Sequence, residues 1–106
     1  MKAIINLPVG VSSLFVGICS VDIHIPWARS LKDKRQELKG IIDKLKNRFN
    51  VSVAEVAAQD FWQHAVLGIS TVSASADLTR QTLQKAVDYI EENANVEVVD
   101  FNIEVL

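Results

Sequence analysis

Residues 15–48 read FVGICSVDIHIPWARSLKDKRQELKGIIDKLKNR, and the organisation of the whole chain follows from this stretch. Apolar side chains occupy every second position between residues 15 and 25, and the intervening positions turn polar from Ser20 onward. This period of two predicts a β-strand over residues 15–25 with one buried face. Pro26 ends the strand because proline has no N–H to donate to a sheet.

A long amphipathic helix is predicted directly after this strand. Ser30 precedes the helix as an N-cap, and Asp33 stands three residues later, which is an aspartate version of the capping box. The apolar positions that follow share one stripe at a period of 3.6 residues: Leu31, Leu38, Ile41, Ile42, Leu45 and Phe49. The pattern predicts a helix from Leu31 to Arg48, ended by Asn50.

The rest of the chain predicts three more strands and a second helix. In chain order these are a strand over 51–58, a polar and aromatic turn over 59–64, a strand over 65–73, a helix that opens at Ser75 or Asp77 and closes at 93–95, and a strand over 96–106. The buried stripe of the second helix is expected to be Leu78, Leu83, Ala86, Val87 and Ile90. One face of the last strand is expected to carry Val99, Phe101, Ile103 and Val105.

The element order β-α-β-β-α-β predicts a ferredoxin-like sandwich. In this α+β fold, right-handed crossovers build a four-stranded antiparallel sheet with both helices on one face. Val16 and Ile18 then lie on the face without helices, where wholly exposed apolar side chains are unfavourable. We therefore predict a homodimer that pairs through this face or through an exposed strand edge. We also expect Gln59 or Asp60 to tie the turn to the 27–29 connection.

Length and composition bound the class of protein. The 106 residues allow one domain, predicted over 14–106, and residues 1–13 form an extension that is either an edge strand or a tail. The start resembles a signal peptide, but Pro8 and Gly10 interrupt its apolar run, so a strand of the mature domain is favoured. The single cysteine, Cys19, favours a reducing cytoplasm, and no segment is apolar enough to span a membrane.

No motif for catalysis, a cofactor or a metal is present in the sequence. The four glycines are not spaced for a dinucleotide or phosphate loop, and there is no CxxC pair. His24 and His64 can meet across the sheet, but a lone histidine is more often simply hydrogen-bonded. Asp22 beside His24 is expected to be a solvated neighbour. We predict no catalytic residue, no metal and no cofactor, and a binding protein rather than an enzyme.

The distribution of charge is the most informative feature for function. The net charge is −2, yet residues 29–48 hold eight of the eleven Lys and Arg residues with three acidic ones, which gives +5 there and −7 elsewhere. Some proteins of this topology bind RNA by stacking bases on sheet aromatics. Here residues 65–73 contain no aromatic side chain, and the polar face of the last strand is acidic. We therefore expect any RNA to contact the basic helix instead of the sheet.

The candidate nucleic-acid-binding residues lie on this helix and on the two connecting segments with a tryptophan. They are Trp27, Arg29, Lys32, Lys34, Arg35, Lys39, Lys46 and Trp62. Lys32, Lys39 and Lys46 are seven residues apart and share one flank of the helix, and the tryptophans offer stacking surfaces. Arg29, Ser30 and Lys34 surround the helix N-terminus, whose free N–H groups favour an anion. The alternative is a solvated helix face that only keeps the protein soluble.

Three stretches of the sequence resemble a known family. Residues 21–35 (VDIHIPWARSLKDKR), 48–56 (RFNVSVAEV) and 59–63 (QDFWQ) are similar to ordered blocks of the YlxP-like family, a bacterial domain of unknown function. The resemblance runs from about residue 14 to 106, and Phe61 stands where the family more often has leucine. It implies a ferredoxin-like fold and a link to translation and ribosome-maturation genes. The family has no established reaction, so it implies no catalytic residues.

Three functions remain open from the sequence. The leading hypothesis is a non-enzymatic protein that binds structured RNA or the ribosome through the basic helix. The second is a sensor domain that binds a small anionic ligand near Arg29, Ser30 and Lys34. The third is a purely structural homodimer. Nucleic acid that co-purifies with the protein and is removed by salt would favour the first.

Overall fold

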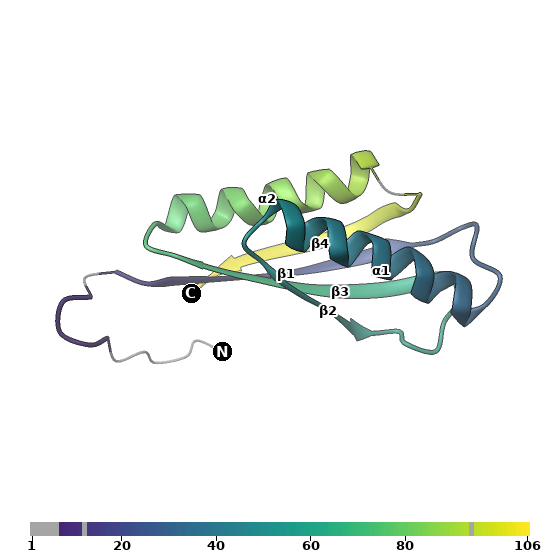
Figure 1. The fold of residues 1–106 in the computed structure, drawn as a ribbon, viewed down its shortest axis with the longest axis horizontal. Coiled ribbons are helices and arrows are strands. Elements are labelled where there is room, and N and C mark those ends of the chain that lie inside the picture. Colours follow the sequence, from purple (N-terminus) through teal and green to yellow (C-terminus); the bar gives the residue numbers. More distant parts are fainter. Residues whose placement is uncertain (1–6, 12, 94) are drawn as a thin grey trace.

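A computed structural model describes residues 7–11, 13–93 and 95–106 (Figure 1). The elements in chain order are β1 (Phe15–His24), α1 (Leu31–Arg48), β2 (Ser52–Ala57), β3 (His64–Ser73), α2 (Ala76–Asn93) and β4 (Glu97–Val105). The four strands form one antiparallel sheet in the order β2-β3-β1-β4, and both helices cover the same face of it (Figure 1). The predicted ferredoxin-like sandwich is confirmed.

The core lies between the sheet and the two helices. The central strand β1 contributes Val21 and Ile23, which are fully buried, and the helices contribute Leu45, Leu83 and Val87, which are equally buried. Full burial of one such aliphatic side chain stabilises a fold by about 1.5–3 kcal/mol. The sheet and helices are therefore held together by one shared apolar layer.

Helix α1 has the bounds that the sequence predicts, and its first turn is capped as expected. The Asp33 backbone N–H donates to Ser30 Oγ over 3.0 Å, and the Arg29 backbone N–H donates to Asp33 Oδ2 over 2.9 Å. These reciprocal bonds satisfy backbone donors at the start of the helix that have no partner within it. The sequence pattern is sufficient here because capping depends on residues only three or four positions apart.

Helix α2 buries four of the five residues predicted for its apolar stripe, namely Leu83, Ala86, Val87 and Ile90, but not the fifth. Leu78 is half exposed, whereas Thr79 is fully buried one turn before Leu83. The Thr79 hydroxyl donates to the Ser75 carbonyl over 2.8 Å and lies 2.9 Å from Ser73 Oγ, so its burial leaves no unpaired polar group. A threonine that satisfies its hydroxyl locally can therefore occupy an apolar stripe, and a hydropathy pattern does not show this.

Strand β4 also departs from strict alternation, because its pairing with β1 shifts at Asp22/Ile23. On one side of this bulge Phe101 pairs with Val21, and on the other side Val98, not Val99, pairs with Ile23. Val99 is consequently 64% exposed, which corrects its predicted place on the apolar face. A bulge inserts one unpaired residue and inverts the facing of the residues beyond it.

The sheet face without helices carries both apolar and polar side chains. Ile18 lies there as predicted, together with Val56 and Val72, and all three are exposed. Pairing of copies through this face remains a prediction.

Before β1, Val11 N–H donates to the Pro8 carbonyl, and the residues of 7–13 that the structure describes join no strand. Residues 1–6 and 12 of the extension lie outside the described residues. Among the described residues, no helix is long and apolar enough to cross a membrane.

Two glycines give a matched test of the packing between sheet and helices. A Cβ added at Gly17 would lie 2.5 Å from Thr79 Cγ2 and 2.7 Å from Leu83 Cδ1, whereas one added at Gly40 meets no atom within 4 Å. Gly17→Ala should lower the free energy of unfolding by about 1–3 kcal/mol through overpacking. Gly40→Ala, in the interior of α1, should raise it by about 0.5–1 kcal/mol. Urea denaturation measures both, and two changes of the same sign would contradict this packing.

Candidate nucleic-acid interface

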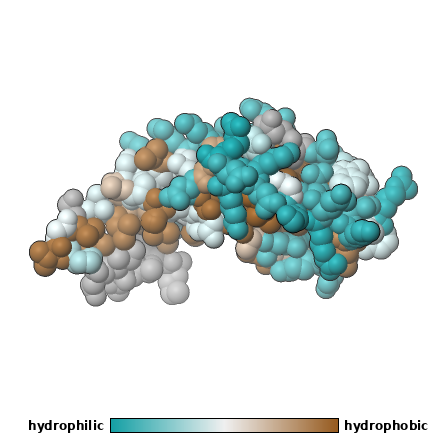
Figure 2. Space-filling view, in the orientation of Figure 1, coloured by the Kyte–Doolittle hydropathy of each residue, from teal (hydrophilic) through white to brown (hydrophobic). Residues whose placement is uncertain are grey.

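The outer side of α1 is a row of exposed cations. Lys32, Arg35, Lys39 and Lys46 are all exposed, as is Arg29 just before the helix. Hydrophilic side chains dominate the surface over α1 in Figure 2. At a rise of 1.5 Å per residue, Lys32 and Lys46 are about 21 Å apart along the helix axis. The three lysines of the predicted flank are therefore all at the surface of the protein.

Two of the exposed basic side chains on α1 interact with the protein itself. Lys39 Nζ lies 2.9 Å from Asp43 Oδ2, one turn further along, and the hydrogen bond and charge of Asp43 raise the pKa of Lys39. The Arg48 guanidinium lies over the Tyr89 ring, 4.7 Å from its centroid. Lys32 and Lys46 are the members of the predicted flank that are not engaged in this way.

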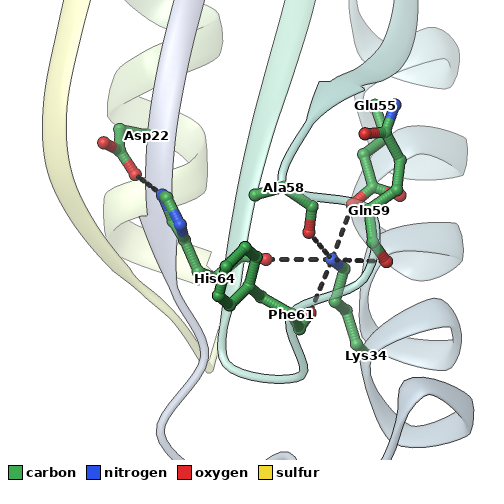
Figure 3. Close-up of polar contacts among 7 residues, drawn as sticks. All are labelled: Asp22, Lys34, Glu55, Ala58, Gln59, Phe61 and His64. Atoms are coloured by element: carbon green, nitrogen blue, oxygen red, sulfur yellow. Dashed lines mark hydrogen bonds and ion pairs between the residues drawn. The ribbon is translucent and has the colours of Figure 1, made fainter.

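Lys34 does not belong to the exposed surface. Its side chain is 1% exposed and its ammonium points into the protein, against the segment that joins β2 to β3 (Figure 3). We name the resulting cluster the Lys34 cage. Its Nζ contacts are the carbonyl oxygens of Ala58 (2.7 Å), Gln59 (3.4 Å), Phe61 (2.7 Å) and His64 (2.9 Å), and Glu55 Oε2 (2.7 Å). This burial corrects the prediction that Lys34 contacts nucleic acid or an anion.

The composition of the Lys34 cage explains how a charge can be buried there. An ammonium has three N–H groups, and the three shortest carbonyl contacts account for them. Glu55 Oε2 lies 2.7 Å from the same nitrogen and supplies the neutralising charge. An isolated buried ammonium would cost several kcal/mol, so both the carbonyls and the carboxylate are needed.

Two sequence features mark the Lys34 cage, although our sequence analysis did not use them. Lys34 occupies a position of the apolar stripe of α1, three residues after Leu31 and four before Leu38. Glu55 has the same strand parity as Val53, which is buried. A lysine and a glutamate that both face a core are expected to pair.

The predicted anion site at the start of α1 is not assembled. Ser30 Oγ and the Asp33 carboxylate accept the local backbone N–H groups, so the chain caps its own helix. Lys34 points inward, and of the three predicted residues only Arg29 offers an exposed charge. The hypothesis of a sensor for a small anion therefore lacks the binding site that it requires.

The connection between β2 and β3, residues 58–63, is anchored to the 26–30 segment. Gln63 Nε2 donates to the carbonyls of Pro26 (3.2 Å) and Ala28 (3.0 Å), and the Ile25 N–H donates to the Gln63 carbonyl (2.9 Å). The expected tie between the two segments is present, but Gln63 makes it. The side chains of Gln59 and Asp60 are exposed, which corrects the prediction that one of them does so.

The two predicted tryptophans lie on these two anchored segments. Trp27 is 41% exposed, and its indole N–H donates to Glu37 Oε1 over 2.7 Å. Trp62 is 54% exposed, and its neighbour Phe61 is 63% exposed. Phe61 is a candidate stacking residue that our sequence analysis did not include.

An open hollow of about 490 Å³ lies beside these aromatic side chains. We name it the loop hollow, and its lining residues are His24, Asp60, Phe61, Trp62, Gln63 and His64.

The two histidines face each other as register partners on β1 and β3, so they do meet across the sheet. Asp22 is not a solvated neighbour of His24, because its Oδ1 lies 2.5 Å from His64 Nε2 (Figure 3). Across the described residues, no group of three or more potential ligands is arranged to hold a metal ion.

Comparison with known proteins places the chain in a family. The family model described as "Protein of unknown function (DUF503)" matches residues 16–103. The chain belongs to the DUF503 family. It is also 38% identical over 82 residues to "Uncharacterized protein YlxP" of Bacillus subtilis (strain 168), which covers 77% of this chain and 89% of that protein. The resemblance drawn from the three sequence blocks is thereby confirmed.

Two solved structures resemble this DUF503 chain at low sequence identity. The de novo designed protein Foldit4 superposes with a TM-score of 0.50 at 10% identity, covering 89% of this chain and 97% of the design. The design Ferredog-Diesel superposes with a TM-score of 0.44 at 9% identity, covering 98% and 95%. The first likeness supports the ferredoxin-like architecture alone.

The Lys34 cage predicts a large difference between two neighbouring lysines. Lys34→Met should lower the free energy of unfolding by about 3–5 kcal/mol, because it leaves the Glu55 carboxylate and the carbonyls without a partner. Lys32→Met, on the exposed side of the same turn, should change it by no more than about 0.5 kcal/mol. Urea denaturation at pH 7 compares the two. Equal effects would show that the ammonium is not buried, and Lys34→Met with Glu55→Met should recover part of the loss.

The single cysteine is expected to be unreactive. Burial in β1 raises the pKa of the Cys19 thiol to about 11, so almost none of the nucleophilic thiolate is present at pH 8. Iodoacetamide at pH 8 should label Cys19 in urea and leave the native protein unlabelled, as read by intact-protein mass. Rapid labelling of the native protein would show an accessible thiol.

Proposed function

We propose that this DUF503 protein is a non-enzymatic RNA- or ribosome-binding protein that contacts phosphates through α1. The observation that carries the proposal is the segregation of charge on a chain with a net charge of −2. Seven of the eight cations between residues 29 and 48 are exposed, and the eighth is Lys34 in its cage. Phosphate attraction by a row of cations is the sequence-independent part of nucleic-acid binding.

The acidic charge on the opposite side of the molecule supports an approach of RNA from the helix side. The sheet face without helices carries Asp22, Asp100 and Glu104, which repel phosphate. RNA would therefore approach the helix side and follow α1, whose free lysines span the distance of several phosphates. Trp27 and Trp62 stand beside the start of this row and offer stacking surfaces.

A homodimer is a second proposal, and it rests on a different observation. Ile18, Val56 and Val72 are exposed together on the helix-free face, where a second copy would cover them. The dimer leaves α1 free, so it is compatible with RNA binding. Light scattering at micromolar concentration should give the dimer mass, and a monomer mass would contradict it.

Charge neutralisation on α1 should weaken RNA binding in a salt-dependent manner. In Lys32→Gln with Lys46→Gln, affinity for purified ribosomal RNA should fall. The slope of log K against log salt should flatten by about 0.7–0.9 for each phosphate that α1 no longer neutralises. Filter binding across a salt series measures both quantities. The folded state should be unaffected because both side chains are exposed.

A charge-matched variant on α2 is the control for that experiment. Arg80→Gln with Lys85→Gln removes the same net charge from exposed positions outside α1 and should leave the salt slope unchanged. If both double variants behave alike, only the net charge matters and α1 is not an interface. If the α1 variant binds with wild-type affinity and slope, α1 is a solvated face.

A further inference from the structure

We propose that the loop hollow binds one unpaired nucleobase. This inference rests on the proposed function, since the base would belong to the RNA whose phosphates contact α1. The hollow has a volume of about 490 Å³, within the range of roughly 300–1,000 Å³ that is usual for small-molecule sites. Its lining combines two aromatic rings, two imidazoles and a carboxylate. A heteroaromatic base, with flat faces and a polar edge, matches this combination.

The faces of a base would stack on the exposed rings of the 58–63 segment. Phe61 and Trp62 are 63% and 54% exposed, and the Phe61 ring also lies 6.2 Å from the His64 imidazole at an angle of 59°. Proteins that bind single-stranded RNA hold splayed bases against rings of this kind. Removal of one such ring typically weakens binding about 5- to 150-fold.

The Lys34 cage fixes the segment so that backbone donors point away from the protein. The carbonyls of Ala58, Gln59 and Phe61 all point at the Lys34 ammonium. The peptide bonds are trans, so the N–H that follows each carbonyl points the opposite way. The N–H groups of Gln59, Asp60 and Trp62 therefore point outward, and among the described residues none of them donates to a protein acceptor. They are free to bind a ligand.

The polar groups of the loop hollow favour a neutral edge over a charged ligand. Asp22 Oδ1 lies 2.5 Å from the His64 imidazole, and Glu97 Oε1 lies 3.6 Å from that of His24. Both of these carboxylates are engaged by histidines and neither lines the hollow, whose one lining carboxylate is that of Asp60. No lysine or arginine lines the hollow, which disfavours a phosphate there. Imidazole nitrogens and the Asp60 carboxylate can instead donate to and accept from the edge of a base.

The position of the loop hollow fits a strand of RNA that follows α1. Lys34 lies near the start of α1 and is bonded directly to the 58–63 segment, so this segment borders the N-terminal end of the helix. Arg29, Lys32 and Arg35 flank Lys34 in sequence and are exposed. A phosphate backbone held by these cations would stay on the helix side of the 58–63 segment. Only its base would turn across the segment toward His24 and His64, which share the sheet face of Asp22.

The first experiment tests the loop hollow with single nucleotides, which are too short to follow α1. In ¹H–¹⁵N NMR spectra of the full chain, AMP, GMP, CMP and UMP are titrated separately, and Trp27→Phe assigns the remaining indole signal to Trp62. At least one nucleotide should shift the Trp62 indole and the amides of Gln59 and Asp60 saturably. N-acetyl-argininamide is the cationic probe. If it produces these shifts and the nucleotides do not, the hollow is a cation site and the proposal is overturned.

The second experiment separates the loop hollow from the basic row. Trp62→Ala should weaken binding of a short single-stranded RNA about 5- to 150-fold and leave the salt slope unchanged. Val99→Ala, a comparably exposed apolar truncation on β4, is the matched control and should bind as wild type. The Lys32→Gln, Lys46→Gln variant should flatten the slope and keep the nucleotide-induced shifts.

The outcomes distinguish the two proposals. If nucleotides bind at Trp62 but RNA affinity is independent of α1, the hollow stands and the proposed function fails. If RNA binds through α1 and Trp62→Ala is silent in both assays, the proposed function stands and the base site is overturned. If no nucleotide shifts the Trp62 indole, the base site is likewise overturned.

Discussion

The burial of one ammonium group organises one end of this molecule. Lys34 reaches from α1 across to β2 and the 58–63 segment, and its charge is accommodated only because Glu55 and several carbonyls converge on it. Ala58 supplies one of these carbonyls from a left-handed conformation with φ of 62°. For a residue with a Cβ this conformation costs about 1–2 kcal/mol, which the contact with the ammonium offsets. His64 belongs to the same cluster, because its carbonyl binds Lys34 while its imidazole contacts Asp22.

The cations of α1 thus have two separate physical roles. Lys34 is part of the interior, whereas the other basic side chains of the helix face water on a chain that is otherwise acidic. The acidic sheet face and the basic α1 point in opposite directions, so the charge of the protein is distributed unevenly over its surface. The segment fixed by Lys34 lies at the boundary between these faces and carries the exposed aromatic rings.

The sequence was sufficient where structure depends on neighbours along the chain. The bounds of α1 and the order of the six elements follow from periodicity and capping, and both are as predicted. Periodicity failed where long-range partners decide the outcome. It indicated a surface cation at Lys34, whose carbonyl partners lie 24–30 residues away. Hydropathy failed for a different reason in α2, where Leu78 was expected in the apolar stripe and Thr79, whose hydroxyl is bonded locally, is buried. The position of the bulge at Asp22/Ile23 depends on the pairing of β1 with β4 and leaves no signature in either strand alone.

The Lys34 cage also constrains the order in which the chain folds. Removing the ammonium from water before its acceptors are in place would cost several kcal/mol, so Lys34 cannot be buried by the collapse of α1 alone. Strands β2 and β3 must pair first, because Glu55 lies on one and the His64 carbonyl on the other. The Ala58 and Phe61 carbonyls are among these acceptors, so the 58–63 segment becomes ordered together with the burial of Lys34. A nascent chain that has formed its helices and an incomplete sheet presents the basic row of α1 but not yet the rigid aromatic rim beside it.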